Sequence, residues 1–182
     1  MKKIFLILTM ALILVTSGCQ KEEVTKIKQS ELESYTVDMS GYKNMSSVNH
    51  NFKGITPETL LKAIDNKESG IFYMGYDGCH VCQNAVSLID EAAKNLNLSV
   101  YYIDCYNELA PLEDYIYEVV DKLKPILNKD SSGEYGIFTP HVFVMVDGEF
   151  KESYIGLDDY DGSDKSKQKE IEHYQEMMKY FE

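Results

Sequence analysis

The sequence lacks an apolar run long enough to span a bilayer as a permanent helix. Its longest apolar run, Ile4 to Val15, covers about a dozen residues, whereas a membrane-spanning helix needs about 20. The run follows Lys2 and Lys3 and leads into the small residues Thr16-Ser17-Gly18 before Cys19. This order is typical of a bacterial export signal, which is removed from the mature protein. We therefore expect residues 1–18 to be a signal peptide.

The ending Thr16-Ser17-Gly18-Cys19 resembles the lipobox of bacterial lipoproteins, although Thr16 stands where leucine is more usual. The resemblance implies cleavage before Cys19 and acylation of that cysteine. Two or more acyl chains give stable anchoring, whereas a single chain binds reversibly. The expected location is the extracytoplasmic face of a bacterial cell membrane, with the lipid on Cys19 as the anchor. A simple secretory signal with an incidental cysteine is the alternative.

Basic side chains are scarce. The chain has 18 lysines and arginines against 30 acidic residues, a formal net charge of −12. Cleavage before Cys19 would remove Lys2 and Lys3 and leave 16 basic residues against 30 acidic ones, a charge of −14. Such a charge repels phosphate backbones and anionic lipid head groups. Nucleic acid is therefore not expected as a partner.

The chain shows no internal repeat, and its 182 residues are too few for two full hydrophobic cores. Residues 19–47 are rich in Lys, Glu, Ser and Thr without a sustained hydrophobic period, which predicts a flexible tether. Within it, residues 35–37 could pair as an edge strand. A single folded domain is expected over residues 48–182.

Hydrophobic patterns in that domain predict five strands and four helices. The strands are expected near residues 50–55, 71–74, 99–105, 141–146 and 149–155, and the helices after Thr56-Pro57, from Cys79, over 112–123 and over 171–181. Asp147-Gly148 is a strong signal for a tight hairpin turn. The order predicts an α/β domain with a mixed sheet.

Cys79-His80-Val81-Cys82 is the motif with clear chemistry. Thiol–disulfide exchange needs one accessible thiolate and a second thiol that resolves the mixed disulfide. Cys79 is predicted at a helix N-terminus, where unpaired N–H groups and the helix dipole favour the thiolate and lower its pKa from about 8.5 to roughly 3.5–7.5. Cys82 lies on the apolar stripe and is the predicted resolver. A protonated His80 could add to the stabilisation of the Cys79 thiolate, or it could simply point into solvent.

Two other readings of these cysteines remain open. One is a static disulfide that pins the start of a helix. The other is a zinc or copper site built from some of the soft ligands in the chain, namely Cys79, His80, Cys82, Cys105 and His141. The sequence has no second C-x-x-C and no spaced pair of histidines, so we predict no metal and no cofactor. Cys105 is most simply a small buried residue at a strand end.

Several segments together resemble the thioredoxin superfamily over residues 48–182. They are Tyr73 to Cys82, Val100 to Cys105, Thr139-Pro140, Val142 to Val146, Gly148 and Gly156. The resemblance implies a thioredoxin-like fold, a central mixed sheet flanked by helices, with a helical insertion before a hairpin that starts at a cis proline. It also implies that Thr139 and Pro140 bind substrate, with the Thr139 backbone pairing with an extended chain. The lead-in Tyr73 to Cys82 and the helical segment before Pro140 look most like secreted and lipoprotein thioredoxins related to bacteriocin transport accessory proteins.

The chain departs from that family because it has no tryptophan. Gly78 replaces the aromatic residue that usually precedes the first cysteine, and Tyr73 aligns with a buried acid, so proton transfer at Cys82 must use another group. We expect a monomeric thiol–disulfide oxidoreductase that acts on exported proteins or peptides together with an unidentified redox partner. Oxidase, reductase and isomerase directions stay open. The alternative is a non-enzymatic lipoprotein of the same fold that binds a partner or delivers copper or zinc.

Overall fold

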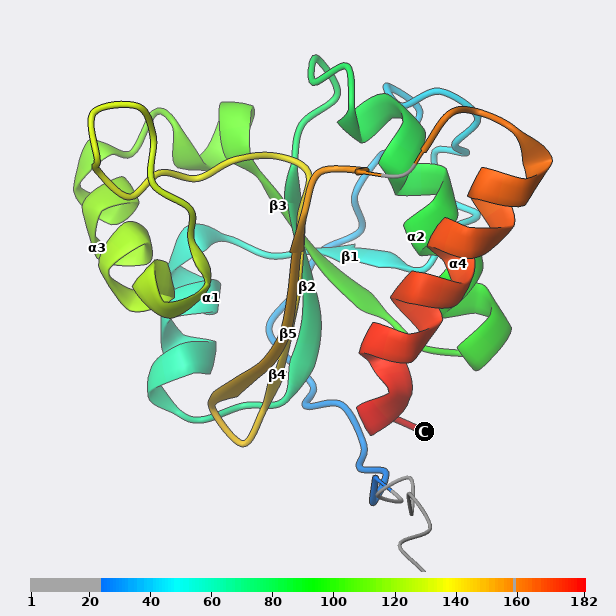
Figure 1. Cartoon of the computed structure of the whole chain (residues 1–182). Coiled ribbons are helices and arrows are strands. Elements are labelled where there is room, and N and C mark those ends of the chain that lie inside the picture. The colour runs from blue at the N-terminus through cyan, green and yellow to red at the C-terminus, as the bar shows by residue number, and fades with distance from the viewer. Residues whose placement is uncertain (1–23, 159) are drawn as a thin grey trace, which may run out of the picture.

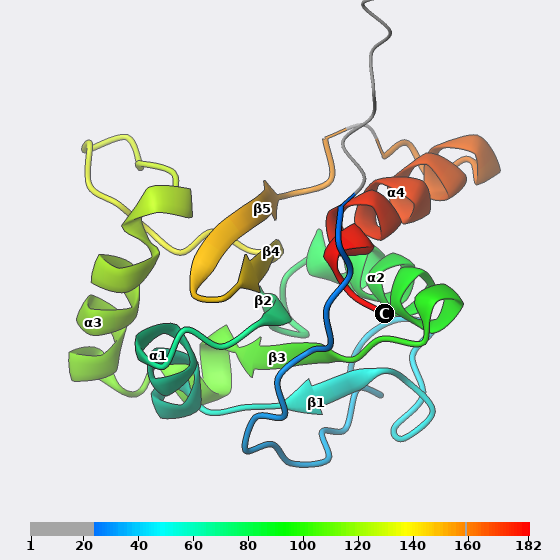
Figure 2. The ribbon, with the colours of Figure 1, turned by 90° about the horizontal axis from the view of Figure 1, so that it is seen from below.

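The structure, a computed structural model, describes residues 24–158 and 160–182 and shows a five-stranded sheet with helices on both faces (Figures 1 and 2). The strands are β1 (Phe52–Gly54), β2 (Gly70–Gly75), β3 (Val100–Asp104), β4 (His141–Val146) and β5 (Glu149–Ile155). The helices are α1 (Pro57–Asp65), α2 (Cys82–Leu96), α3 (Glu113–Leu123) and α4 (Asp164–Met177), with short π or 3-10 turns at Cys105–Leu109, Lys124–Ile126 and Met178–Tyr180. The predicted signal peptide and Cys19 lie outside the described residues.

The sheet is mixed, as predicted. Its strand order is β1-β3-β2-β4-β5, with β1, β3 and β2 parallel and β4 antiparallel to both β2 and β5. The β4–β5 hairpin turns at Asp147 and Gly148, whose φ angles of 51° and 79° are left-handed. Two successive residues with left-handed φ angles form a turn whose twist matches that of the flanking strands. The predicted tight turn at this position is confirmed.

Each face of the sheet carries its own hydrophobic core. Seen from below, α1 and α3 lie on one side of the sheet and α2 and α4 on the other (Figure 2). Along β2 the side chains alternate between the two cores: Ile71 and Tyr73 contribute to the α2/α4 core, and Phe72 and Met74 to the α1/α3 core. A central strand that is covered on both faces has apolar side chains at nearly every position, which explains the continuous apolar run of β2. Both cysteines of the motif belong to the α2/α4 core.

Local signals set several helix ends. The Thr56 hydroxyl accepts a hydrogen bond from Thr59 N (3.2 Å) and Pro57 is the first residue of α1, a favourable N-terminus. Helix α3 ends at Leu123, two residues before Pro125. It lies between β3 and β4, where the helical segment before Pro140 is predicted. The strand order and the helices on both faces confirm the predicted α/β thioredoxin-like fold, a central mixed sheet flanked by helices. In the part of the chain that the structure describes, no helix is both long and apolar enough to cross a bilayer.

The prediction of a flexible tether over residues 19–47 is wrong for residues 24–47. Ile27 forms a parallel bridge with Phe181, and Tyr35 forms an antiparallel bridge with Gly54, the one trace of the predicted edge strand. The side chains of Met39 (0% exposed) and Tyr42 (4% exposed) are part of the α2/α4 core. Apolar residues that do not recur at helix or strand spacing give no signal of secondary structure. Here they nevertheless pack into a core whose other side chains come from later parts of the chain.

Candidate active site

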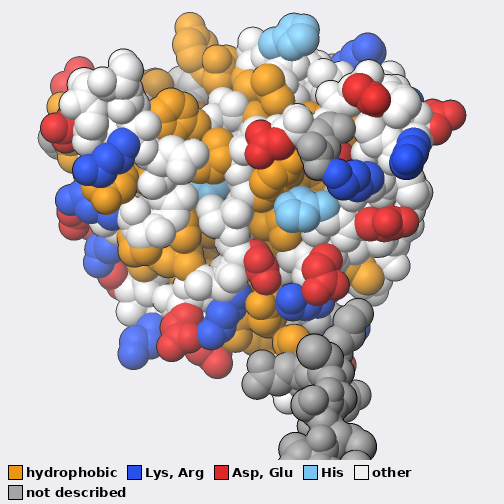
Figure 3. All heavy atoms as spheres, in the orientation of Figure 1, with side chains coloured by type: hydrophobic (Ala, Val, Ile, Leu, Met, Phe, Trp, Pro, Cys, Tyr) orange, Lys and Arg blue, Asp and Glu red, His pale blue; other side chains and the backbone are white. Residues whose placement is uncertain are grey.

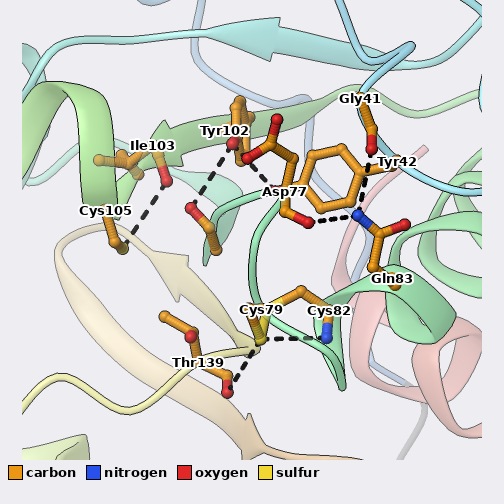
Figure 4. Close-up of a disulfide and its surroundings, with 11 residues drawn as sticks. Gly41, Tyr42, Asp77, Cys79, Cys82, Gln83, Tyr102, Ile103, Cys105 and Thr139 are labelled. Atoms are coloured by element: carbon orange, nitrogen blue, oxygen red, sulfur yellow. Dashed lines mark hydrogen bonds between the residues drawn. A yellow bond between two sulfur atoms is a disulfide. The ribbon is translucent and has the colours of Figure 1, made fainter.

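Cys79 and Cys82 form a disulfide at the junction of β2 and α2 (Figure 4). The regular helix begins at Cys82, three residues later than the predicted start at Cys79. Cys79 nevertheless acts as a cap: its carbonyl accepts from Gln83 N at 3.1 Å and its Sγ accepts from Cys82 N at 3.1 Å. A backbone N–H and the positive end of the helix dipole therefore face the Cys79 sulfur, which favours a thiolate there after reduction.

The two cysteine residues differ in exposure. Cys79 is 8% exposed and Cys82 is 0% exposed. Between them, His80 is exposed and Val81 is 40% exposed. The greater exposure of Cys79 is compatible with its predicted role as the nucleophile, and the two roles stay predictions. His80 makes no hydrogen bond or ion pair within residues 24–158 and 160–182, and its electrostatic role stays a prediction.

Thr139 and Pro140 lie beside the disulfide, as the resemblance implies. Their peptide bond is cis, and the Thr139 carbonyl oxygen is 3.6 Å from Cys79 Sγ. A disulfide sulfur has no proton, so this is a van der Waals contact until reduction gives Cys79 a thiol that can donate. Pro140 O accepts from Gly156 N at 2.8 Å, but Thr139 makes no backbone hydrogen bond in the described part of the chain. Its main-chain groups are therefore available to an extended substrate.

Gln83 connects the loop between β2 and α2 (residues 76–81, here called the active-site loop) to the N-terminal segment, residues 24–47. No sequence signal indicated this connection. Its Nε2 donates to the Gly41 carbonyl at 3.1 Å and to the Asp77 carbonyl (Figure 4). Its Oε1 accepts from Lys43 N at 2.5 Å. A glutamine on the first turn of an amphipathic helix resembles any solvent-facing residue. Only the packing of residues 41–43 against the loop makes it a connector.

Three buried tyrosines, Tyr42, Tyr73 and Tyr102, pack together in the α2/α4 core. The Tyr42 and Tyr102 hydroxyl oxygens are 2.9 Å apart, and Tyr102 donates to Gly75 O at 3.5 Å. The Tyr73 hydroxyl lies near that of Tyr42 but makes no hydrogen bond of ordinary geometry with the described residues. Burial raises the pKa of Tyr73 well above its usual value, so it stays a neutral phenol at physiological pH. Tyr73 therefore cannot serve as the base for Cys82.

Cys105 begins the π-helical turn after β3. Its thiol donates to Ile103 O at 3.8 Å. Burial, aided by the nearby charge of Asp104, raises the pKa of Cys105 to about 12. Cys105 therefore stays protonated at neutral pH and is a weak nucleophile. The residue is partly exposed, so the prediction of a fully buried cysteine at the strand end is not met. Within the described residues, no three His, Cys, Asp or Glu side chains are grouped in a way that could hold a metal ion.

His141, directly after Pro140, is fully buried. Its Nε2 is 2.9 Å from Ser153 Oγ, and its Nδ1 has no hydrogen-bond partner among the described residues. Burial lowers the pKa of His141 to about 4. The histidine is therefore neutral in the folded protein over a pH range in which an unfolded chain would protonate it.

This difference predicts acid sensitivity. Between pH about 6.5 and about 4 the unfolded state binds a proton at His141 that the folded state does not, so stability is full above this window and decreases as pH falls through it. The expected loss is about 3 kcal/mol in the free energy of unfolding. Urea unfolding across the window measures it. His141→Phe should remove this part of the pH dependence, whereas His80→Gln, at an exposed position, should leave it in place; equal slopes in all three proteins would contradict the prediction.

Comparison with known proteins gives matches of structure alone. No protein-family model matches the chain, and no curated protein matches its sequence. Similar solved structures include oxidized thioredoxin O2 from Arabidopsis thaliana (16% identity, 61% of this chain and 87% of that chain, TM-score 0.41) and thioredoxin from Plasmodium falciparum (17%, 66% and 97%, 0.40). Thioredoxin from Aeropyrum pernix is a third (16%, 70% and 84%, 0.39). The assignment of the fold therefore rests on the strand order and helix placement of the chain itself.

Proposed function

We propose that this protein is a thiol–disulfide oxidoreductase. One observation carries the proposal: a Cys79–Cys82 disulfide at the start of α2, with its more exposed sulfur 3.6 Å from the carbonyl of a cis-bonded Thr139. A static structural disulfide would have no need of an accessible sulfur beside main-chain groups that lack partners.

The reaction follows from the two positions. In the reducing direction, the Cys79 thiolate attacks one sulfur of a substrate disulfide and releases the other as a thiolate. Cys82, deprotonated, then attacks Cys79 Sγ, which frees the substrate thiol and leaves the Cys79–Cys82 disulfide. Two electrons pass from the enzyme dithiol to the substrate, and an external dithiol returns them. The oxidising direction is the reverse sequence.

We place this activity outside the cytoplasm, on exported proteins or peptides, and we propose the lipid on Cys19 as the membrane anchor. The proposal is supported by the order Lys2-Lys3, apolar run and Thr16-Ser17-Gly18-Cys19, and by the persistence of C-x-x-C disulfides in oxidising compartments. The resemblance of residues 73–82 supports a finer placement among secreted thioredoxin-like proteins related to bacteriocin transport accessory proteins. Metabolic labelling with a radioactive fatty acid, lost in Cys19→Ala, tests the anchor.

A Cys82→Ser variant tests the reaction. Without the resolver, the mixed disulfide at Cys79 cannot be released, so adducts with cellular proteins should accumulate and disappear on reduction. They are visible as slower bands on non-reducing gels. Cys105→Ser in the same background should leave the adducts unchanged. If no adduct forms, the protein does not exchange disulfides; metal that co-purifies in stoichiometric amount and is lost in Cys79→Ser would then favour metal delivery.

A further inference from the structure

A cavity of about 850 Å³ opens next to the disulfide, between α3 and the segment that leads to Pro140. One face of α3 forms its first wall, through Ile116, Tyr117 and Val120. Tyr135 and Phe138 form the opposite wall. In the space-filling view, hydrophobic side chains gather between the centre of the face and the upper left lobe, where Figure 1 shows α3 and the loop after it (Figure 3). We call this cavity the aromatic pocket.

The pocket is continuous with the site of exchange. Thr139, whose carbonyl is 3.6 Å from Cys79 Sγ, is also a lining residue of the pocket. Tyr76, in the loop that carries Cys79, lines it as well and stacks on Tyr106 with ring centroids 5.8 Å apart. A main chain that pairs with Thr139 thus runs along the edge of the pocket. Successive side chains of an extended chain point to opposite sides, so a side chain near the reacting cysteine would enter it.

The outer wall is preformed. Residues 128–136 form a small hairpin, with a bridge between Lys129 and Tyr135 and backbone hydrogen bonds from Asp130 N to Glu134 O (2.8 Å) and from Gly136 N to Asn128 O (3.2 Å). Lys129 Nζ lies 4.8 Å from the centroid of the Tyr135 ring, a cation–π contact that holds the ring. A pocket that exists before binding loses less entropy when it binds.

Exposure and charge indicate what the pocket accepts. Tyr117 is 76% exposed, Tyr135 38% and Phe138 37%, so apolar surface is left for a partner to cover. The polar rim carries Asp121 paired with Lys124 at 2.6 Å. It also carries Glu134, which forms no ion pair with the described residues. Together with Lys129 over the Tyr135 ring, the rim has two acidic and two basic side chains, so its charge favours neither sign of ligand.

We propose that the aromatic pocket binds a bulky apolar side chain, preferably aromatic, close to the reacting cysteine of an extended polypeptide substrate. The inference rests on the proposed function, because it takes the main chain at Thr139 as the substrate's path. It implies that residues of α3 and of the 128–138 segment determine which substrates bind. Through these residues the protein selects unfolded or extended chains with exposed aromatic side chains.

The absence of tryptophan from the chain gives a direct test. The probes are two short peptides whose single cysteine is blocked as a disulfide with glutathione; one carries tryptophan two residues from the cysteine and the other serine. Reduced Cys79 displaces glutathione and forms a mixed disulfide, which Cys82→Ser preserves. The tryptophan emission of that adduct should shift to the blue as the ring leaves water, and the tryptophan peptide should react about tenfold faster than the serine peptide.

Substitutions in the aromatic pocket test whether the pocket causes the emission shift and the rate preference. Phe138→Ala and Tyr117→Ser, both at exposed positions, should each abolish most of the emission shift and of the rate preference. Leu112→Ala, at a 43% exposed position outside the pocket, should change neither. Adducts that form without an emission shift, or a shift that survives both pocket variants, would overturn the inference while the proposed function stands. Failure of both peptides to form an adduct would instead contradict the proposed function and the inference with it.

Discussion

Replacing Cys79 by serine should reduce the rate of disulfide exchange at least about a thousandfold. Cys79 supplies the sulfur that attacks, and a serine hydroxyl is far less acidic than a thiol and forms no mixed disulfide. Cys82 cannot take over, because its side chain is fully buried in the α2/α4 core. Reduction of a protein disulfide by the purified chain, followed under excess external dithiol, measures the loss. Cys105→Ser should retain the activity of the unmodified protein.

Exposure and thiol pKa together predict the order of chemical modification. In the reduced protein, limiting iodoacetamide should label Cys79 well ahead of Cys82, which is fully buried, because a backbone N–H faces the Cys79 sulfur. Cys105 is partly exposed but should also react slowly, because desolvation raises its pKa to about 12. Peptide mapping after brief labelling shows which thiol reacted. Preferential labelling of Cys82, or full activity in Cys79→Ser, would reverse the roles assigned to the two cysteines.

Met39→Ala should destabilise the protein by about 2–5 kcal/mol, the usual range for removing a buried methionine side chain. The side chain is 0% exposed and belongs to the α2/α4 core, which also holds both active-site cysteines. A flexible tether would tolerate the change without effect. The midpoint of urea unfolding, at unchanged slope, measures the difference.

The matched control is Val48→Ala, in the same part of the chain but 73% exposed, for which a change within about 0.5 kcal/mol is expected. Equal stability of Met39→Ala and the unmodified protein would mean that residues 24–47 do not contribute to the core in solution. The variant also bears on function. Residues 41–43 contact the active-site loop through Gln83, so loosening this segment should lower the rate of exchange as well.

Much of the site could be predicted because its signals are local. The spacing of Cys79 and Cys82 and the hydrophobic period after them require no knowledge of the rest of the chain. The Thr139-Pro140 pair was predicted from its resemblance to a family, and the structure places it beside Cys79. The role of Gln83 and the aromatic pocket were not predicted. Gln83 meets Gly41 from 42 positions earlier in the chain, and the pocket brings together Tyr76, α3 and residues 134–139. No residue type along the chain marks these meetings.

Some features of the tyrosines could likewise be predicted from the sequence, whereas others depend on packing. The sequence predicts that Tyr101 and Tyr102 lie in a strand, and they do. It does not predict that Tyr102 meets Tyr42 from the N-terminal segment at 2.9 Å, or that burial keeps Tyr73 a neutral phenol. The direction of a pKa shift depends on desolvation by surrounding atoms, and those atoms are supplied by the tertiary structure.

The order of strands and helices, the mixed sheet and the cysteine pair could all be predicted from the sequence, because hydrophobic period, turn residues and motif spacing act over a few neighbouring positions. That residues 24–47 contribute to the core, and that α3 and the hairpin at 128–136 enclose a pocket beside the disulfide, became evident only from the tertiary structure. These features are contacts between distant segments. Burial and shape emerge only when the segments pack against one another.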